Sequence, residues 1–194
     1  VEIIGPLEVD SVTFTDQEHT NWKVFLDGQL DTGKYYSLKV DSLMDCPHNS
    51  MNKPETVEFI LPFKPRKGDV IINEVLFDPL PDGSDMVEVY NSSQRVLDLA
   101  GWQLAHFDDG IEDRETITDK RHLFFPGDYL YLAEDSMDIK IRYPAAKVDR
   151  SIQMDNMPTY WNDTGTVILI TSEDEIMEEF TYSEEMHHPI IRDP

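Results

Sequence analysis

Cysteine is nearly absent from this chain of 194 residues, which has a single one, Cys46. One thiol cannot form a disulfide within the chain, so no disulfide framework supports the fold. A lone cysteine is more often a small packed residue than a reactive one. Cysteine usage therefore does not distinguish between an oxidising and a reducing compartment.

Basic residues are also scarce. The chain has 16 lysines and arginines against 39 acidic residues, which gives a net charge of −23. Residues 1–67 contain 11 acidic and 7 basic side chains, and residues 68–194 contain 28 and 9. Affinity for nucleic acid comes mainly from basic side chains that neutralise phosphates. The charge therefore excludes nucleic acid as a partner, and a well-solvated acidic surface needs no ligand to explain it.

Long apolar segments are missing as well. No run approaches the roughly 20 apolar residues that a membrane helix requires, and the apolar start, Val1 to Ile4, is too short for a targeting peptide. We expect the chain to be a fragment of a longer protein. The sequence also has no nucleophile elbow, phosphate-binding glycine loop or His-Glu-x-x-His motif. We therefore expect no enzymatic activity in it.

Short apolar runs separated by turns dominate what is present. Twelve prolines and nine glycines among such runs predict an all-β chain. The composition shifts at Pro62-Phe63-Lys64-Pro65-Arg66-Lys67-Gly68, a stiff basic segment typical of a linker. We predict a smaller β domain at 1–62, a linker at 63–67 and a second domain at 68–194.

The segment from Gly68 to Leu104 contains the most specific pattern. A strand at 70–77 is followed by a turn, a strand at 85–90, an Asn-Ser-Ser turn and a third strand from Trp102. In the second strand apolar and polar residues alternate, which predicts a sheet with one face in the core. The ordered motifs I-N-E-V, D-x-V-E-V-Y-N and D-L-x-G-W-x-L resemble the lamin tail domain. This resemblance implies an immunoglobulin-like β-sandwich that binds or supports rather than catalyses.

The N-terminal part resembles the final strands of bacterial immunoglobulin-like domains, which commonly contain Y-x-L-x-V followed by a Gly-Asn turn. Here Tyr36, Leu38 and Val40 match, and His48 stands where that pattern has glycine. The unit is short for a complete sandwich of about 100 residues. Strands are predicted at 7–15, 22–26, 35–40 and 56–61.

Further elements are predicted in the second domain. Residues 122–125 and 129–133 flank Pro126-Gly127-Asp128, which is typical of a hairpin turn. Residues 134–143 form a short helix capped at Asp135 or Ser136. Strands at 166–170 and 177–182 are joined by an acidic connection and form another hairpin.

An acidic loop follows the Trp102 strand, from Asp108 to Glu115. Carboxylate oxygens are the ligands that Ca²⁺ prefers, and Gly110 permits a sharp turn. The spacing differs from the calcium-loop pattern, so a solvated loop is the simpler interpretation and a Ca²⁺ site is the alternative; no other cofactor is indicated. The candidate metal ligands are Asp108, Asp109, Asp113 and Glu115.

Aromatic and amide side chains lie together before the 166–170 strand, in M-D-N-M-P-T-Y-W-N-D. Aromatic faces stack on apolar surfaces while amides form hydrogen bonds, as in carbohydrate or peptide recognition. The candidate binding residues are Tyr160, Trp161 and Asn162. The alternative is that Trp161 fills one end of the sandwich.

Two other clusters have simpler structural explanations. Metal ions are commonly bound by Glu and His, and the chain has Glu184, His187 and His188 close together. However, adjacent histidines on an extended chain point in different directions. Glu74 and Glu88 could act as an acid–base pair, as in glycosidases. Because both lie inside the motifs of the resemblance, structural roles explain them better.

Taken with the resemblance, these patterns favour a non-catalytic module of an exported bacterial protein, extracellular or at the cell surface. Such a module acts in attachment, protein contact or spacing, and its partner is an unidentified protein or glycan. The alternatives are an accessory module of a secreted hydrolase or nuclease and a calcium-stabilised carbohydrate-binding domain. The ligand, the anchor and the oligomeric state are not encoded in recognisable motifs.

Overall fold

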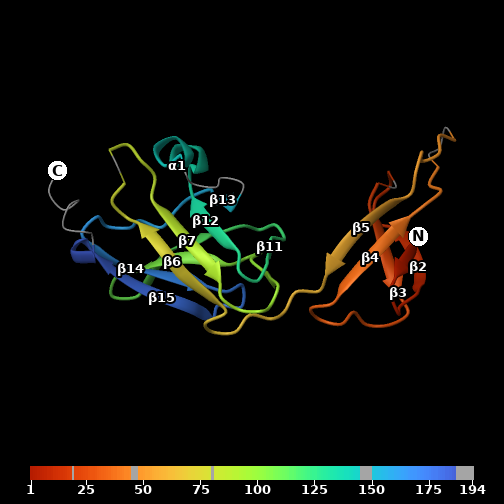
Figure 1. The fold of residues 1–194 in the computed structure, drawn as a ribbon, viewed down its shortest axis with the longest axis horizontal. Helices are drawn as coiled ribbons and strands as arrows, with labels where there is room; N and C mark the ends of the chain where they lie inside the picture. Colours follow the sequence, from red (N-terminus) through yellow and green to blue (C-terminus); the bar gives the residue numbers. More distant parts are fainter. Residues whose placement is uncertain (19, 45–47, 80, 145–149, 187–194) are drawn as a thin grey trace. The chain divides into compact units, whose positions relative to one another are not determined.

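A computed structural model describes residues 1–18, 20–44, 48–79, 81–144 and 150–186. The chain is all-β, with 46% of residues in strands and 6% in helices. It divides into two compact units, Val1–Phe63 and Lys64–Pro194. Each unit is described by itself (Figure 1).

The N-terminal unit contains a three-stranded sheet and a two-stranded ribbon. The sheet has the order β1 (Glu2–Ile4), β4 (Tyr35–Val40), β5 (Glu55–Ile60), and the ribbon pairs β2 (Val9–Phe14) with β3 (Trp22–Leu26). All these pairs are antiparallel. The predicted strands at 22–26 and 35–40 are confirmed, and the other two are shifted by one or two residues.

Few side chains of this unit are buried. Among its described residues the buried apolar side chains are Ile3, Tyr36 and Ile60. Phe14, Phe25, Tyr35 and Val57 are all exposed by 40% or more. His48 has a φ of 69°, the left-handed conformation that glycine adopts most readily.

The larger unit, from Lys64 onward, is a sandwich of two four-stranded sheets. The first has the order β13 (Ser151–Gln153), β12 (Tyr129–Ala133), β7 (Met86–Asn91), β6 (Val70–Leu76). The second has the order β10 (Ile111–Thr116), β9 (Gln103–Phe107), β14 (Thr164–Ile170), β15 (Ile176–Ser183). The short strands β8 (Leu97–Asp98) and β11 (Leu123–Phe124) pair with each other.

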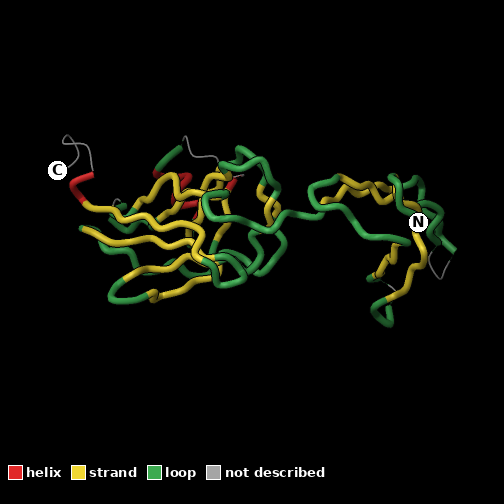
Figure 2. The backbone as a smooth tube through the Cα atoms, turned by 90° about the horizontal axis from the view of Figure 1, so that it is seen from below, coloured by secondary structure: helices red, strands yellow, loops and turns green. Residues whose placement is uncertain are grey.

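The core of this unit lies between the two sheets. Residues paired across strands point to the same face, so Val87 and Val89 of β7 share a face with Leu132 and Leu130 of β12. Trp102, just before β9, is 1% exposed and is the largest fully buried side chain. The β14–β15 hairpin predicted around the acidic connection is confirmed. Figure 2 shows how long segments without regular structure connect these strands.

Strand β7 differs from its prediction, because both of its faces are covered. On the face away from Val87, Met86 packs against Ala133 of β12 and against Ile139 of helix α1 (Ser136–Arg142). Glu88 on that same face is 6% exposed. The prediction of one solvated face is therefore wrong, because α1 and the polar partners of Glu88 cover it. The helix itself is confirmed, with Asp135 as its N-cap, which accepts hydrogen bonds from the amides of Met137 and Asp138.

The hairpin predicted around Pro126-Gly127-Asp128 is wrong. The chain does turn there, but β11 pairs with β8, whereas β12 pairs with β7 and β13. The turn amide of Gly127 donates to the Asn91 carbonyl at 2.9 Å, and the Asn91 amide donates to the Asp128 carbonyl at 3.0 Å. The turn residues are therefore bound to the end of β7, and the two flanking strands separate.

Four strands lie where no strand was predicted, namely β1, β8, β10 and β13. Edge strand β10 occupies the second half of the predicted acidic loop, and β13 runs parallel to β12. An edge strand has one neighbour and needs few apolar residues, and in β10 the partly buried residues are Ile111, Glu115 and Thr116. A bulge between Glu112 and Glu115 interrupts its pairing, with Asp113 at a φ of 51°.

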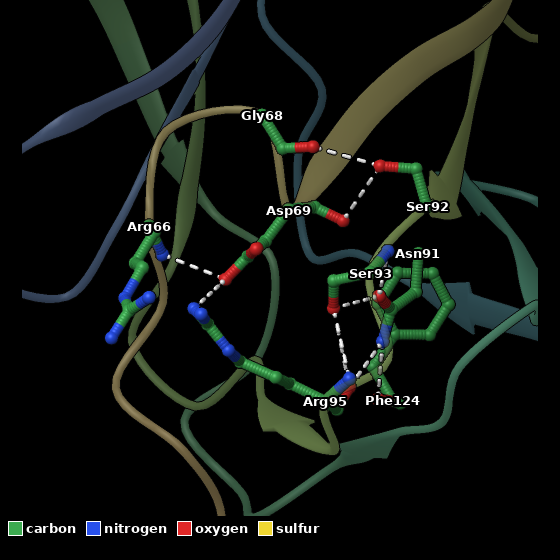
Figure 3. A network of polar contacts seen from close by, with 8 residues as sticks. All are labelled: Arg66, Gly68, Asp69, Asn91, Ser92, Ser93, Arg95 and Phe124. Atoms are coloured by element: carbon green, nitrogen blue, oxygen red, sulfur yellow. Dashed lines mark hydrogen bonds and ion pairs between the residues drawn. The ribbon is translucent and has the colours of Figure 1, made fainter.

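The Asn-Ser-Ser turn after β7 forms a polar network that joins several segments (Figure 3). Asn91 is fully buried and donates to the carbonyls of Arg95 at 2.8 Å and Phe124 at 2.9 Å. Its side-chain oxygen accepts from both the amide and the hydroxyl of Ser93. All of its side-chain hydrogen-bonding groups are thus used, as burial of an amide requires.

Ser92 and Asp69 attach the start of β6 to the same network. The Ser92 hydroxyl donates to the Gly68 carbonyl at 2.7 Å. The Asp69 carboxylate accepts from the Arg66 amide at 2.9 Å and from the Arg95 guanidinium at 3.0 Å. The predicted Asn-Ser-Ser turn therefore binds several segments of the unit together.

Candidate functional site

The segment between β13 and β14, residues 154–163, has no regular structure and is fixed by carboxylates; we call it the Trp161 loop. Four of its N–H groups donate to acidic side chains from three different parts of the unit. The bonds are Asn156 Nδ2 to Glu115 at 3.5 Å, Met157 N to Glu134 at 3.2 Å, Thr159 N to Asp113 at 2.6 Å, and Asn162 Nδ2 to Asp78 at 2.9 Å. Hydrogen bonds to an ionised acceptor are among the stronger kinds. The loop is thus held from several sides.

Tyr160 and Trp161 point in opposite directions from this loop. Tyr160 is 4% exposed and fills space inside the unit, whereas Trp161 is 47% exposed. The expectation of an exposed Tyr160–Trp161 pair is therefore wrong for Tyr160, because adjacent side chains on an extended segment face opposite sides. The alternative that Trp161 fills the end of the sandwich is also wrong, since Tyr160 occupies the interior.

Aromatic side chains of neighbouring strands contact Trp161. The Tyr182 hydroxyl donates to the Trp161 carbonyl at 2.9 Å, and the Tyr182 ring stacks on Phe77 with centroids 4.1 Å apart. His106 packs against the indole with an interplanar angle of 70° and centroids 5.2 Å apart. A Cβ atom on Gly165 would collide with the Tyr182 hydroxyl, so this position requires glycine. The backbone of Trp161 is therefore fixed while its ring remains accessible.

One unpaired polar group and one carboxyl with a raised pKa belong to the Trp161 loop and its surroundings. The Tyr160 hydroxyl is the one buried side-chain polar atom among the described residues that has no hydrogen-bond partner. Burial, followed by the charges of Glu134 and Asp78, raises the pKa of Asp85 to about 6. Burial also raises the pKa of Tyr160 well above its ordinary value and that of Tyr182 to about 12, and Asp85 adds to both shifts. Asp85 therefore carries an unfavourable charge at neutral pH.

The candidate calcium ligands are not brought together. Asp108 and Asp109 lie in the turn between β9 and β10, whereas Asp113 and Glu115 lie on β10 and bind the Trp161 loop. Over the described ranges of the chain, no group of three or more His, Cys, Asp or Glu side chains is placed to hold a metal ion. Two of the four predicted ligands thus have a structural role instead.

The other predicted clusters are placed as follows. Glu184 is exposed in the short 3₁₀ helix η2 (Glu184–Met186), and His187 and His188 lie outside the described residues. Glu88 accepts from Asn73 Nδ2 at 2.6 Å and stands opposite Glu74 in the ladder between β6 and β7. Because Glu88 is 6% exposed and already hydrogen-bonded, its environment is that of a structural carboxylate.

Several residues of this site were not anticipated. Asp78, Glu134 and Tyr182 all bind the Trp161 loop, and His106 packs on it. They lie between 21 and 84 residues from their partners in the chain. No local pattern signals such contacts, so the sequence offers no way to identify them.

The comparison with family models gives one match, to the Lamin Tail Domain, over residues 64–184. The chain belongs to the lamin tail domain family. No curated protein matches it. Lamin tail domains are structural, immunoglobulin-like modules, so the predicted immunoglobulin-like sandwich and the predicted family are both confirmed.

The matched range contains the whole site. Trp161, the carboxylates that hold its loop and the Asn91 network all lie within this lamin tail domain. No helix in the described parts of the chain is long and apolar enough to cross a membrane. The candidate site lies on a module of a family known for structural rather than catalytic roles.

Proposed function

We propose that this lamin tail domain is a non-catalytic binding module of an exported bacterial protein and acts at the cell surface. Its contact residue is Trp161, which binds a glycan or an apolar side chain of a partner protein. Export is inferred from the family, since lamin tail modules occur in many bacterial surface and secreted proteins. The binding role rests on one observation: an indole that is 47% exposed on a loop held by four carboxylates.

The physical argument is one of low entropic cost. A side chain that is ordered before binding loses little conformational freedom when a partner arrives. The Trp161 backbone is fixed through Tyr182 and its ring through His106. The Asn162 amide and the Asp78 carboxylate beside it supply hydrogen-bonding groups for hydroxyls or peptide groups.

The test compares Trp161→Ala with Phe107→Ala. Phe107 is also 47% exposed, and it lies on β9 next to His106, whose side chain points to the opposite face. Immobilised saccharides and purified surface proteins are screened against the wild-type chain, and every hit is titrated with both variants. We expect a loss of about tenfold or more for Trp161→Ala and almost none for Phe107→Ala.

Equal losses in the two variants would contradict the proposal. The proposal would also be contradicted if Trp161→Ala left the affinity for every hit unchanged, or if neither the saccharides nor the surface proteins gave a hit. Far-UV circular dichroism and the midpoint of thermal unfolding establish that both variants are folded.

A further inference from the structure

The two sheets of the lamin tail domain leave an open groove along one side. β6 and β15 are the last strands of their sheets and contact each other (Figure 1). A groove of about 210 Å³ lies between them, and we call it the β6–β15 groove. Trp161 does not line it, so it is a different surface from the proposed Trp161 contact.

The groove has an apolar interior. Phe77 and Tyr182 form its buried part, 4% and 1% exposed, and their rings stack. Phe180 is 37% exposed and Met186 is 61% exposed, although both line the groove. These two side chains leave apolar surface in water at a place where a partner side chain fits.

Glu74 lines the groove, and the elements that border it contain further acidic residues. β6, β15 and the following helix η2 contain no lysine or arginine. Their acidic residues are Glu74, Glu178, Glu179, Glu184 and Glu185. None of these five side chains belongs to an ion pair found among the described residues. A basic ligand would therefore meet acidic side chains that pair with no described lysine or arginine.

The outer edge of β15 is suited to accept a further strand. β15 spans eight residues, and its pairing with β14 is regular from Thr164 to Leu169. In contrast, a bulge between Ile72 and Glu74 interrupts β6. Glu179, Phe180 and Thr181 in the middle of β15 are all exposed. Unpaired backbone groups along an edge strand bind extended peptides by adding a strand to the sheet.

We propose that the β6–β15 groove binds an extended segment of a partner protein in which basic and apolar residues alternate. The segment pairs with the outer edge of β15, on which no described strand lies, because that edge is the longer regular one. With a period of two, its apolar side chains enter the groove at Phe180 and Met186. Its basic side chains point to the opposite face of the sheet, where Glu179 is exposed on β15.

Charge excludes a second copy of this chain as the occupant. The chain has a net charge of −23, and both edges that would meet are acidic. A second explanation of the glutamates involves no partner: acidic side chains on an edge strand prevent the strand edges of two molecules from pairing. That explanation accounts for the glutamates but not for Phe180 and Met186, which remain exposed inside the groove.

The test uses the full chain labelled with ¹⁵N and the capped peptide Lys-Val-Lys-Phe-Lys-Val-Lys. A peptide of the same charge, with serine in place of valine and phenylalanine, measures charge attraction alone. We expect saturable shifts of the amide signals of 178–183 with the first peptide. The serine peptide should bind at least about fivefold more weakly, and N-methylation of alternate residues should abolish the shifts.

Matched variants locate the contact. Glu179→Lys should weaken binding roughly fivefold, whereas Glu112→Lys makes the same charge change on β10, the opposite edge of the same sheet, and should have little effect. Phe180→Ala should weaken binding as well, and Trp161→Ala should leave it unchanged. The inference is overturned if the two peptides bind equally, if the shifts lie outside β15 and β6, or if both charge variants lose the same affinity. Failure of the Trp161 contact would not affect any of these results.

Discussion

The two units of this chain are both built from antiparallel strands, but they differ in what those strands bury. Among the described residues of each unit, Val1–Phe63 has three buried apolar side chains and Lys64–Pro194 has 25. In β2 five of six residues are exposed, whereas in β7 five of six are buried. Strand-forming sequence is thus common to both units. Two opposed four-stranded sheets, found in the lamin tail domain, produce an enclosed core.

The same contrast extends to the loops. Polar side chains of the lamin tail domain, such as Asn91 and Asp113, bind segments that are distant in the sequence. In the N-terminal unit the Asp16 carboxylate binds Thr20 and Asn21, and the side-chain hydrogen bonds of this acid hold its pKa at about 2. Local bonds order a turn, whereas distant bonds fix one element against another. A site that requires fixed geometry is therefore expected on the larger unit.

The largest effect should come from the core that only one unit possesses. Trp102→Ala removes a side chain that is 1% exposed and should lower the free energy of unfolding of the lamin tail domain by about 3–5 kcal/mol. Phe25→Ala in the N-terminal unit, where Phe25 is 40% exposed, should cost about 1 kcal/mol or less. Urea unfolding followed by circular dichroism measures both. Similar losses for the two variants would remove the difference between the units.

The Asn91 network should give the next largest effect. Asn91→Ala deprives two carbonyl groups of their donor, and we expect a loss of about 2–3 kcal/mol in unfolding free energy. Asn162→Ala is the matched control, because Asn162 is exposed and forms one hydrogen bond to Asp78. Asn162→Ala should lower the free energy of unfolding by less than about 1 kcal/mol. A cost for Asn91→Ala no greater than that of the control would show that the network does not stabilise the fold.

Replacement of Asp85 should change the free energy of unfolding by less, and should raise it rather than lower it. Its pKa of about 6 in the folded protein exceeds the ordinary value of 3.8, so the folded state binds the proton more tightly. Stability from this group is present below about pH 4 and is lost as the pH rises towards 6. After allowance for partial exposure, Asp85→Asn should stabilise the protein at pH 7 by about 1–2 kcal/mol.

The pH profile provides the control for Asp85→Asn. Wild type and variant should have similar stability near pH 4 and diverge between pH 4 and 6, in thermal or urea unfolding. A variant that is less stable than wild type at pH 7 would show that the ionised Asp85 contributes favourable interactions.

Addition of Ca²⁺ should have the smallest effect on the stability of the protein. Because Asp113 and Glu115 already accept hydrogen bonds from the Trp161 loop, we expect the same midpoint of thermal unfolding with excess Ca²⁺ and with chelator at constant ionic strength. A site filled at about 100 times its dissociation constant would instead add roughly 2.7 kcal/mol. An increase of several degrees with Ca²⁺ but not with Mg²⁺ would restore the alternative of a cation site.

The sequence predicts local features of this fold well and distant contacts poorly. The strands predicted at 22–26 and 35–40, and the capped helix after Asp135, depend on neighbouring residues, and all three are confirmed. The turn at Gly127 is also local, but the pairing of its flanking strands depends on β7 and β8, and that prediction is wrong. Strand β10 is mostly charged, so apolar periodicity could not reveal it.

The candidate site shows the same division. Trp161 and Asn162 stand out by their residue types, and so do the acidic residues near Asp113. The sequence does not show that these two segments meet, because Thr159 and Asp113 are 46 residues apart. Nor does it show that Tyr160 faces inward and Trp161 outward, which follows from packing against Tyr182 and His106.

The central claim is that carboxylates hold the Trp161 loop in place before any partner binds. Hydrogen exchange of the Thr159 and Met157 amides tests it directly, because these amides donate to Asp113 and Glu134. We predict slow exchange of both amides in the wild type, and faster exchange at Thr159 in Asp113→Ala with the core strands unchanged. Fast exchange of both amides in the wild type would contradict a preformed loop, and with it the proposed role of Trp161.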